Sequence, residues 1–399
     1  MAGETPSEAS TAVSSYKCRA VIGGNNLQVA DRTAVHELFQ EVAGPPAAMA
    51  TARTVLGLAA STGAIASLAD AEQAFVQCRI DGPGRPRSWV RLPKAWWPAE
   101  WAGMYDPVVP LERALYGHPE SGPLWDKHFA GMLIALKYVR VPSCPGTWFR
   151  NCDRTLLVVY VDDIMMVCFK QFYDSCWAEI SLQVKFKELP EPVSRYLGVN
   201  HVFRREPVGS VVLTHLVLEM RLFIAQAVEL YLLDIGKVKL SIVDTPYLAS
   251  TCPETPEEFE KGVLGHRASS HLMKLLYAAR MACPWLITQI VRLAKFVSCW
   301  LVYHDKALHR LFCFCFANPD VVLNGSMCSS DSDILELHLH ADADQAGDKN
   351  TTKSTSGMWL ELFAPKTEVL LEERTWPVEW CSKKQSSTAS STAEAETIS

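Results

Sequence analysis

The chain has 399 residues, of which 49% are hydrophobic and 21% are charged. This apolar content excludes a disordered protein, and the length predicts two or three domains. The 38 basic and 44 acidic residues give a net charge of −6, which excludes a uniformly basic nucleic-acid coat but not a basic groove on one domain. Residues 331–399 hold 13 of the acidic and 6 of the basic residues, so the acidic excess belongs to the tail.

The cysteines and the uncharged runs predict a soluble, intracellular chain. The 13 cysteines include no Cys-x-x-Cys pair, and a chain of this length buries a core without disulfides, so reduced thiols are expected. Residues 1–15 lack the apolar core of a signal peptide. The longest uncharged run, between Arg53 and Asp70, is shorter than the ~20 residues that span a bilayer.

The first part of the chain predicts a disordered start, a helix and a strand. Residues 1–15 are small and polar and are predicted to be disordered. A Gly-Pro-Pro sequence at 44–46 precedes a helix predicted from Ala48 to about Ala60, and an extended segment is expected to end near Asp70. Residues 79–94 are rich in basic residues, Gly and Pro, which predicts a loop or a hairpin.

The rest of the chain alternates between helical and β-forming segments. Apolar periodicity and turn residues predict a helix over 111–139 interrupted near 119–123, strands at 147–150 and 155–169, a helix over 219–235 ended by Gly236, a helical region over 266–316 broken at Pro284, a linker over 324–333 and strands beyond it.

The most informative segment has two apolar, β-forming runs around an adjacent pair of acids, Asp162 and Asp163. A strand–turn–strand arrangement places both carboxylates at the tip of a hairpin, where they stay solvated while the arms are buried. An ordinary turn is the alternative, because Asp is a common turn residue. A third carboxylate, Asp70, follows a run of small residues upstream. Three such carboxylates would suit two divalent ions that clamp an in-line phosphoryl displacement.

A series of motifs in chain order resembles the Pol polyprotein of copia-type long-terminal-repeat retrotransposons. Tyr160-Val161-Asp162-Asp163 is the polymerase motif of reverse transcriptases, and Asp70 with Ala74-Phe75 resembles the family's Asp-x-x-x-Ala-Phe segment. The other polymerase segments are Tyr16–Val21, Ala114–Gly117 with Trp125, and Tyr196–Val199; the ribonuclease H segments are Asp342–Asp344, Lys353–Gly357, Trp380–Gln385 and Ala395-Glu396.

The resemblance implies an α+β chain with a right-hand polymerase fold of fingers, palm and thumb, followed by a partial ribonuclease H-like α/β domain. It implies fingers and palm over residues 16–210, a helical thumb or connection region over 211–330, and a truncated ribonuclease H-like domain over 331–399.

By resemblance, Asp70, Asp162 and Asp163 are the catalytic residues and hold two Mg²⁺ ions, with Mn²⁺ as the alternative. Phe75, Arg19 and Lys17 would bind the nucleotide: the Phe75 ring would collide with a ribose 2′-hydroxyl, and Arg19 would reach the triphosphate. From the local sequence, a core Phe75 and a solvated strand face carrying Lys17 and Arg19 stay open as alternatives.

In the tail, the resemblance makes Asp342 the first metal-binding carboxylate of the ribonuclease H segment and Glu396 the second, with Glu394 as the alternative register. Alternation over residues 335–342 predicts a half-buried strand with His338, His340, Asp342 and Asp344 on one face. That face is either a separate metal site or the solvated face of an edge strand.

Three departures from the family pattern are visible in the sequence. The chain stops three residues after Glu396, so a truncated and catalytically incomplete ribonuclease H is expected. The family's Leu-Lys-Gln is replaced by His118-Pro119-Glu120, which predicts a carboxylate where the family has a neutral amide. The family's Trp after Asp344 is Gln345.

The sequence as a whole predicts an RNA-directed DNA polymerase of a copia-type element. The implied partners are an RNA template, a DNA or tRNA primer, dNTPs and other segments of the element's polyprotein, with no membrane. The implied location is the cytoplasm, in a particle, with the nucleus as the alternative. A catalytically degenerate nucleic-acid-binding or structural protein is the alternative function, and a metallohydrolase built on the tail histidines is a third.

Overall fold

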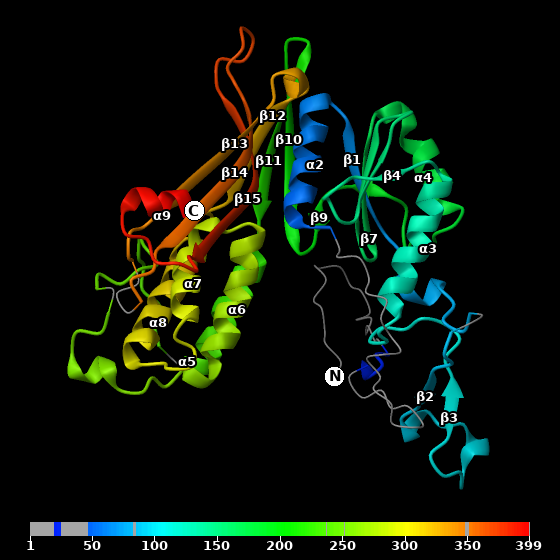
Figure 1. The fold of residues 1–399 in the computed structure, drawn as a ribbon, viewed down its shortest axis with the longest axis horizontal. Coiled ribbons are helices and arrows are strands. Elements are labelled where there is room, and N and C mark those ends of the chain that lie inside the picture. The colour runs from blue at the N-terminus through cyan, green and yellow to red at the C-terminus, as the bar shows by residue number, and fades with distance from the viewer. Residues whose placement is uncertain are drawn as a thin grey trace. The chain divides into compact units, whose positions relative to one another are not determined.

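The structure is a computed structural model, drawn in Figure 1. It describes residues 20–24, 47–82, 85–236, 238–250, 252–347 and 351–398. The predicted disordered segment 1–15 and the predicted nucleotide ligands Lys17 and Arg19 lie outside the described residues.

The chain divides into two compact units, each assembled from segments that are distant in sequence. Unit 1 comprises residues 1–47, 69–166 and 171–190, and unit 2 comprises residues 48–68, 167–170 and 191–399. In the part of the chain that the structure describes, no helix is both long and apolar enough to cross a membrane.

Unit 1 contains the predicted strands and the predicted hairpin. Strand β5 covers the predicted segment 147–150, and β6 with β7 forms the hairpin predicted over 155–169. Its elements, including strands shared with unit 2, are β1 (Ile65–Asp70), β2 (Trp89–Arg91), β3 (Val108–Pro110), α3 (Ser121–Ala135), β4 (Val139–Arg140), β5 (Thr147–Arg150), β6 (Thr155–Tyr160), β7 (Asp163–Cys168) and α4 (Tyr173–Ser181).

Helix α3 is shorter than the helix predicted over 111–139. The chain cannot enter a helix earlier, because Gly117 has a φ of 90° and Pro119 follows it. Beyond the helix, Lys137 has a φ of 65° and turns the chain into β4. The basic segment 79–94 contains β2, which pairs with β3, so the prediction of a hairpin is confirmed in part.

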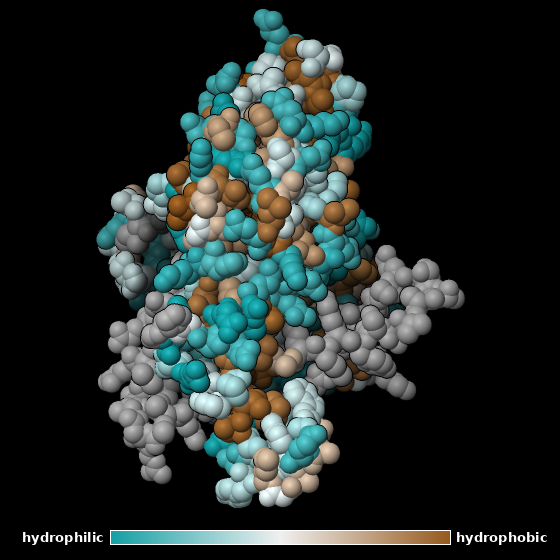
Figure 2. All heavy atoms as spheres, turned by 90° about the vertical axis from the view of Figure 1, so that its right-hand side faces the viewer, coloured by the Kyte–Doolittle hydropathy of each residue, from teal (hydrophilic) through white to brown (hydrophobic). Residues whose placement is uncertain are grey.

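Strand β2 and the long connection from it to β3 carry exposed aromatic residues. Trp89 is 55% exposed, Trp96 is 59% exposed and Tyr105 is 98% exposed. The β2–β3 segment forms the lower end of the face in Figure 2, where pale spheres lie beside hydrophobic brown ones.

Unit 2 contains a four-stranded sheet, a three-stranded sheet and a group of helices. The four-stranded sheet has the order β12-β11-β10-β9 and the three-stranded sheet the order β13-β14-β15. The elements are α2 (Met49–Thr62), β8 (Glu191–Pro192), β9 (Arg195–Tyr196), β10 (Val199–Val208), β11 (Val211–Glu219), α5 (Arg221–Ile235), α6 (Gly265–Met281), α7 (Ile287–Ala294), α8 (Val302–Ala317), β12 (Leu323–Cys328), β13 (Glu336–Ala343), β14 (Thr355–Ala364), β15 (Arg374–Lys384) and α9 (Thr392–Ile398).

The predicted helices of unit 2 are confirmed, with one addition. Helix α2 matches the predicted helix at its start, and α5 ends at Gly236, whose φ of 75° is accessible to a residue without a side chain. The predicted break at Pro284 separates α6 from α7. A second break, over residues 295–301, separates α7 from α8 and was not predicted.

The linker predicted over 324–333 is wrong. Residues 323–328 form β12, which pairs with β11 in an antiparallel register. Asp331 follows in a short 3₁₀ helix, is completely buried, and accepts hydrogen bonds from the Arg374 guanidinium at 2.8 Å through both carboxylate oxygens. Ser, Asp and Gly are typical of solvated linkers, but here Gly325 and Asp331 are buried by partners that are distant in sequence.

Helix α2 packs against β15. Arg53 on this helix is 2% exposed and donates hydrogen bonds to the carbonyl oxygens of Val378, Arg280 and Met281, each at 2.8 Å. Trp376 is completely buried and donates its ring N–H to the Arg53 carbonyl at 2.8 Å. The tail strands are therefore part of the core of unit 2.

Candidate active site

The tip of the β6–β7 hairpin carries the two adjacent acids in the predicted arrangement. The turn consists of Val161 and Asp162, and Asp163 is the first residue of β7. Val161 has a φ of 57°, which is costly for a β-branched residue. Trp125 on α3 donates its ring N–H to the Val161 carbonyl at 2.7 Å and holds the turn in this conformation.

Asp70 lies beside this turn, at the end of β1. The backbone N–H of the next residue, Ala71, donates to the Asp162 carbonyl at 2.7 Å. Strands β1 and β7 are neighbours in the sheet, so the end of β1 meets the start of β7. The structure therefore brings Asp70, Asp162 and Asp163 together, although β1 is far from the hairpin in sequence.

The three carboxylates influence one another electrostatically. The pKa of Asp163 is raised to about 6, mainly by burial and also by the negative charges of Asp162 and Asp70, while the positive charge of Lys187 opposes the change. Lys187 forms an ion pair with one carboxylate oxygen of Asp70, and its backbone N–H donates to the Asp70 carbonyl at 3.0 Å. Three neighbouring carboxylates, with Lys187 as the lysine that the described residues place beside them, form a site that a cation would stabilise.

The second carboxylate oxygen of Asp70 fits a metal ion. This atom, Oδ1, is buried and has no hydrogen-bond partner among the described residues. A buried, unpaired carboxylate oxygen destabilises a fold unless a ligand satisfies it. Oxygen ligands at the junction of two acidic segments are those that Mg²⁺ prefers. The donor set therefore fits divalent ions.

Phe75 follows Asp70 by five residues and lies on a 3₁₀ helix, Ala74–Gln77, that comes shortly after β1. Its ring is half-buried and packs at an angle of 57° against the ring of Tyr116, with a centroid distance of 4.6 Å. Tyr116 belongs to one of the motifs, but sequence reasoning assigned it no role. Its ring holds the Phe75 ring in place.

Glu120, the carboxylate that replaces the family's amide, has a cationic partner. Its Oε1 lies 3.6 Å from the Arg85 guanidinium, and the residue is 9% exposed. His118 also faces inward: its Nδ1 accepts the Glu120 backbone N–H at 3.2 Å, and its Nε2 lies 2.9 Å from the Ser88 hydroxyl. The Arg85 guanidinium therefore compensates the charge of this carboxylate.

Sequence reasoning missed the cationic partners of two acidic residues. Lys187 contacts Asp70 from a segment after α4, and Arg85 pairs with Glu120 from the basic loop. Lys187 stands in the alternating sequence Lys185-Phe186-Lys187, which indicates an extended segment with lysines on one side. Nothing local in that pattern identifies its partner.

The tail places its two predicted metal ligands on neighbouring elements. Asp342 lies near the end of β13 and Glu396 lies on α9, and both are exposed. The residues next to them, Ala343 and Ala395, are buried in one cluster. Gln345, which replaces the family's Trp, accepts a hydrogen bond from the Thr392 hydroxyl at 2.9 Å and joins α9 to the end of β13.

The face predicted to carry His338, His340, Asp342 and Asp344 is only partly a group. The two histidines gather with Glu361 of β14. Asp344 instead accepts the backbone N–H of Thr355, and Asp342 accepts the N–H of Ala343 at 2.9 Å.

Comparison with known proteins agrees with the resemblance found in the sequence. Residues 5–213 match the model of the family described as reverse transcriptase (RNA-dependent DNA polymerase). The chain is 26% identical over 380 residues to the retrovirus-related Pol polyprotein from transposon TNT 1-94 of Nicotiana tabacum, covering 90% of this chain and 25% of that protein.

Two similar proteins come from Arabidopsis thaliana. The Pol polyprotein from transposon RE1 is 25% identical over 72% of this chain, and that from transposon RE2 is 26% identical over 73% of it; the alignments cover 18% of each relative. The chain thus spans about a quarter or less of the length of these relatives. Because the family model covers more than half of the chain, the chain belongs to the reverse transcriptase (RNA-dependent DNA polymerase) family, as its resemblance to copia-type Pol polyproteins predicted.

Proposed function

We propose that this chain is the RNA-directed DNA polymerase part of a copia-type Pol polyprotein. The observation that carries the proposal is the convergence of Asp70, Asp162 and Asp163, with a buried and unpaired Asp70 oxygen, in a chain of the reverse transcriptase family. The proposed reaction is the attack of a primer 3′-hydroxyl on the α-phosphorus of a dNTP. A phosphodiester bond forms and pyrophosphate leaves.

Asp70, Asp162 and Asp163 would hold two Mg²⁺ ions, or Mn²⁺ in their place. When bound, such ions supply charge stabilisation at the attacking and leaving oxygens of an in-line displacement. The chain's own groups position these ligands. Lys187 fixes one oxygen of Asp70 and leaves Oδ1 available, and the Trp125 ring N–H fixes the turn that carries Asp162.

The nucleotide is proposed to lie against the paired rings of Phe75 and Tyr116. Phe75 is proposed to exclude a ribose 2′-hydroxyl, and its contact with Tyr116 holds the ring in place. The proposed partners are an RNA template, a DNA or tRNA primer and dNTPs, with Lys17 and Arg19 on the triphosphate. Along the chain, we propose that residues 16–210 form the fingers and palm, residues 211–330 the thumb or connection region, and residues 331–399 a truncated ribonuclease H-like domain.

In the tail, Asp342 and Glu396 are proposed as the metal ligands of the ribonuclease H-like segment. The packing of Ala395 against Ala343 supports this, because it brings α9 and the end of β13 side by side. Neither residue contributes to the proposed polymerase site.

The experiment that tests the polymerase proposal is primer extension on an RNA template with dNTPs and Mg²⁺. Asp162→Asn should abolish extension, because it removes a charge without changing the size of the side chain. The matched control is Asp174→Asn, which alters an exposed carboxylate on α4 and should extend like the wild type.

Equal extension by wild type and Asp162→Asn would refute the assignment. Binding of template and primer without extension by the wild type would instead favour the degenerate nucleic-acid-binding protein.

A further inference from the structure

Strands β13 and β14 present a group of metal-ligating side chains that the polymerase proposal does not use. His338 and His340 alternate onto one face of β13, and Glu361 stands opposite His338 in the register of β14. One ring nitrogen of each histidine and one oxygen of Glu361 lie within 4.8 Å of one another. The carboxylate lies diagonally across the strands, with its Oε1 3.3 Å from the His340 Nε2.

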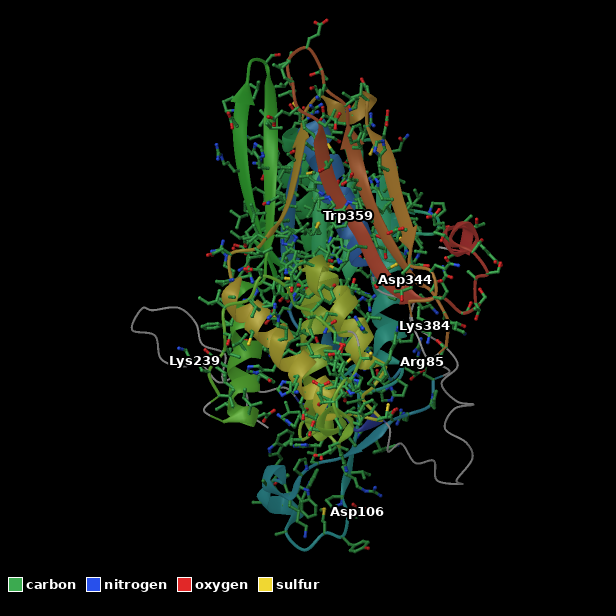
Figure 3. All side chains as sticks on the ribbon, turned by 90° about the vertical axis from the view of Figure 1, so that its left-hand side faces the viewer. Arg85, Asp106, Lys239, Asp344, Trp359 and Lys384 are labelled. Atoms are coloured by element: carbon green, nitrogen blue, oxygen red, sulfur yellow. The ribbon has the colours of Figure 1, made fainter. Side chains whose placement is uncertain are left out.

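Neighbouring side chains hold two of these groups in orientation. Trp359 donates its ring N–H to the second oxygen of Glu361 at 2.8 Å, which fixes the plane of the carboxylate. Figure 3 labels Trp359 on the three-stranded sheet that includes β14. The Phe363 ring stacks on His338 at 4.1 Å with an interplanar angle of 13°. The second oxygen of Glu336 lies 2.7 Å from the His338 Nε2. Partners that orient the ligands are a regular part of metal sites.

We propose that His338, His340 and Glu361 form a Zn²⁺ site. Zinc takes imidazole nitrogen and carboxylate oxygen at ~2.0–2.2 Å in a tetrahedral arrangement, which places ligand atoms roughly 3.4 Å apart. The three ligand atoms are already within 4.8 Å, and the His340 side chain is 61% exposed, so rotation of this ring closes the remaining gap. Two imidazoles favour a transition-metal ion over Mg²⁺, which prefers oxygen ligands.

The site leaves a fourth position for water and lies at a groove. His340 lines a groove of about 310 Å³ together with Trp359, Trp380 and Ile287. Strand β13 is an edge strand of its sheet, with Leu337 and Leu339 each more than half exposed. An ion bound by two β13 residues and one β14 residue would clamp this edge to the strand beside it.

The test is calorimetric titration of the full chain with Zn²⁺ after the accessible thiols have been blocked with iodoacetamide. One ion should bind per chain, and a large excess of Mg²⁺ should not displace it. His340→Gln and Glu361→Gln should each weaken binding by more than about 100-fold, since each removes a ligand. Trp359→Phe keeps all ligands but removes the donor that orients Glu361, so a loss of about 10- to 100-fold is expected.

The matched control is His128→Gln, which removes an exposed histidine from α3 and should bind Zn²⁺ like the wild type. Absence of binding by the thiol-blocked wild type would overturn the proposal. Equal affinity of His340→Gln and His128→Gln would do the same, as would displacement of Zn²⁺ by Mg²⁺. None of these outcomes depends on polymerase activity, so the two proposals fail separately.

Discussion

The two oxygens of Asp70 have opposite environments. One forms an ion pair with Lys187, and the other is buried and has no hydrogen-bond partner within the described part of the chain. Beside it, burial and two neighbouring carboxylates raise the pKa of Asp163. The unpaired oxygen of Asp70 and the crowding of carboxylates around Asp163 each destabilise the fold. Their coincidence at one hairpin tip is typical of a functional site, because structural carboxylates are normally fully paired.

His201 provides a test of the fold that is independent of the active site. It lies in β10 and is 4% exposed, and its Nδ1 is 3.0 Å from the carbonyl oxygen of Val199. Its pKa is lowered from 6.5 to about 4, mainly by burial; the hydrogen bond to Val199 opposes this change, and the positive charge of Arg53 contributes to it.

The lowered pKa predicts a loss of stability in acid. The folded state binds this proton less readily than the unfolded state, so the contribution is complete above pH 6.5 and is lost as the pH falls towards 4. Each pKa unit corresponds to about 1.4 kcal/mol, so the free energy of unfolding should fall by about 2 kcal/mol from this group between pH 7 and pH 5. Urea denaturation at both pH values measures the change.

The control for His201 is His201→Gln, which removes the titrating group. This variant is expected to be less stable than the wild type at pH 7, but its stability should depend less on pH. Other buried histidines contribute equally to both proteins and cancel in the comparison. An identical pH dependence of wild type and variant would show that His201 is protonated equally in the folded and unfolded states.

At the level of elements, the sequence correctly predicts the helices and strands whose formation depends on residues close together in the chain. Strand β5, the β6–β7 hairpin and helix α5 follow from residue spacing and from a terminal glycine. The hairpin was also expected to carry its acids at the tip. These elements share a property: their apolar periodicity and turn residues lie within a few residues of one another.

Elements that depend on distant partners were not predictable in this way. Strand β12 was mistaken for a linker because its stability comes from pairing with β11 and from the buried ion pair between Asp331 and Arg374. The same reason applies to the candidate active site. The motifs identify Asp70, Asp162 and Asp163, whereas Lys187 is recognisable only once the fold has brought it to Asp70.

The packing of α2 against the tail strands can be tested with a pair of glycines. A Cβ on Gly57 would lie 2.6 Å from a Leu362 methyl group and 2.9 Å from the Trp376 ring, which is completely buried. Gly57→Ala should therefore lower the free energy of unfolding by about 1–3 kcal/mol, as overpacking does. This is the net change, after the gain of about 1 kcal/mol that alanine brings relative to glycine in a helix interior.

The matched control is Gly131→Ala in the middle of α3, where a Cβ would meet nothing within 4 Å. This substitution should stabilise the protein by about 1 kcal/mol through helix propensity alone. Urea denaturation measures both variants. The same stabilisation from Gly57→Ala would mean that α2 does not lie against Leu362 and Trp376 as closely as described.

At the level of the whole molecule, the compact units do not follow the order of the chain. The sequence predicts a polymerase followed by a ribonuclease H-like appendage that begins near residue 331. Unit 2, however, joins α2 from the first part of the chain with β15 from the last. A three-stranded sheet on its own leaves an open edge. The contacts of α2 with Trp376 and Val378 show that the tail strands pack against the rest of unit 2.

This architecture predicts that removing residues 331–399 destabilises the residues that remain in unit 2. In a chain ending at Ser330, Arg53 would lose the Val378 carbonyl and the Trp380 ring, whose centroid lies 4.0 Å from its guanidinium. The buried indole of Trp376 would be lost as well. Deleting one large buried aromatic side chain costs about 3–5 kcal/mol, and whole domains are stable by only about 5–15 kcal/mol. Unit 2 should therefore not fold cooperatively.

The comparison that tests this is between the chain ending at Ser330 and a chain ending at Ser390. The second lacks only α9, whose contacts are small: Ala395 packs in a cluster with Ala343, and its carbonyl accepts the Gln385 amide N–H at 2.7 Å. Amide hydrogen exchange on α2 measures the outcome, because Arg53 of this helix contacts Val378 and Trp380 of the tail. Fast exchange is expected in the shorter chain and near-normal protection in the longer one. Equal protection of α2 in both would show that the tail is a separate appendage, as the order of the motifs alone predicts.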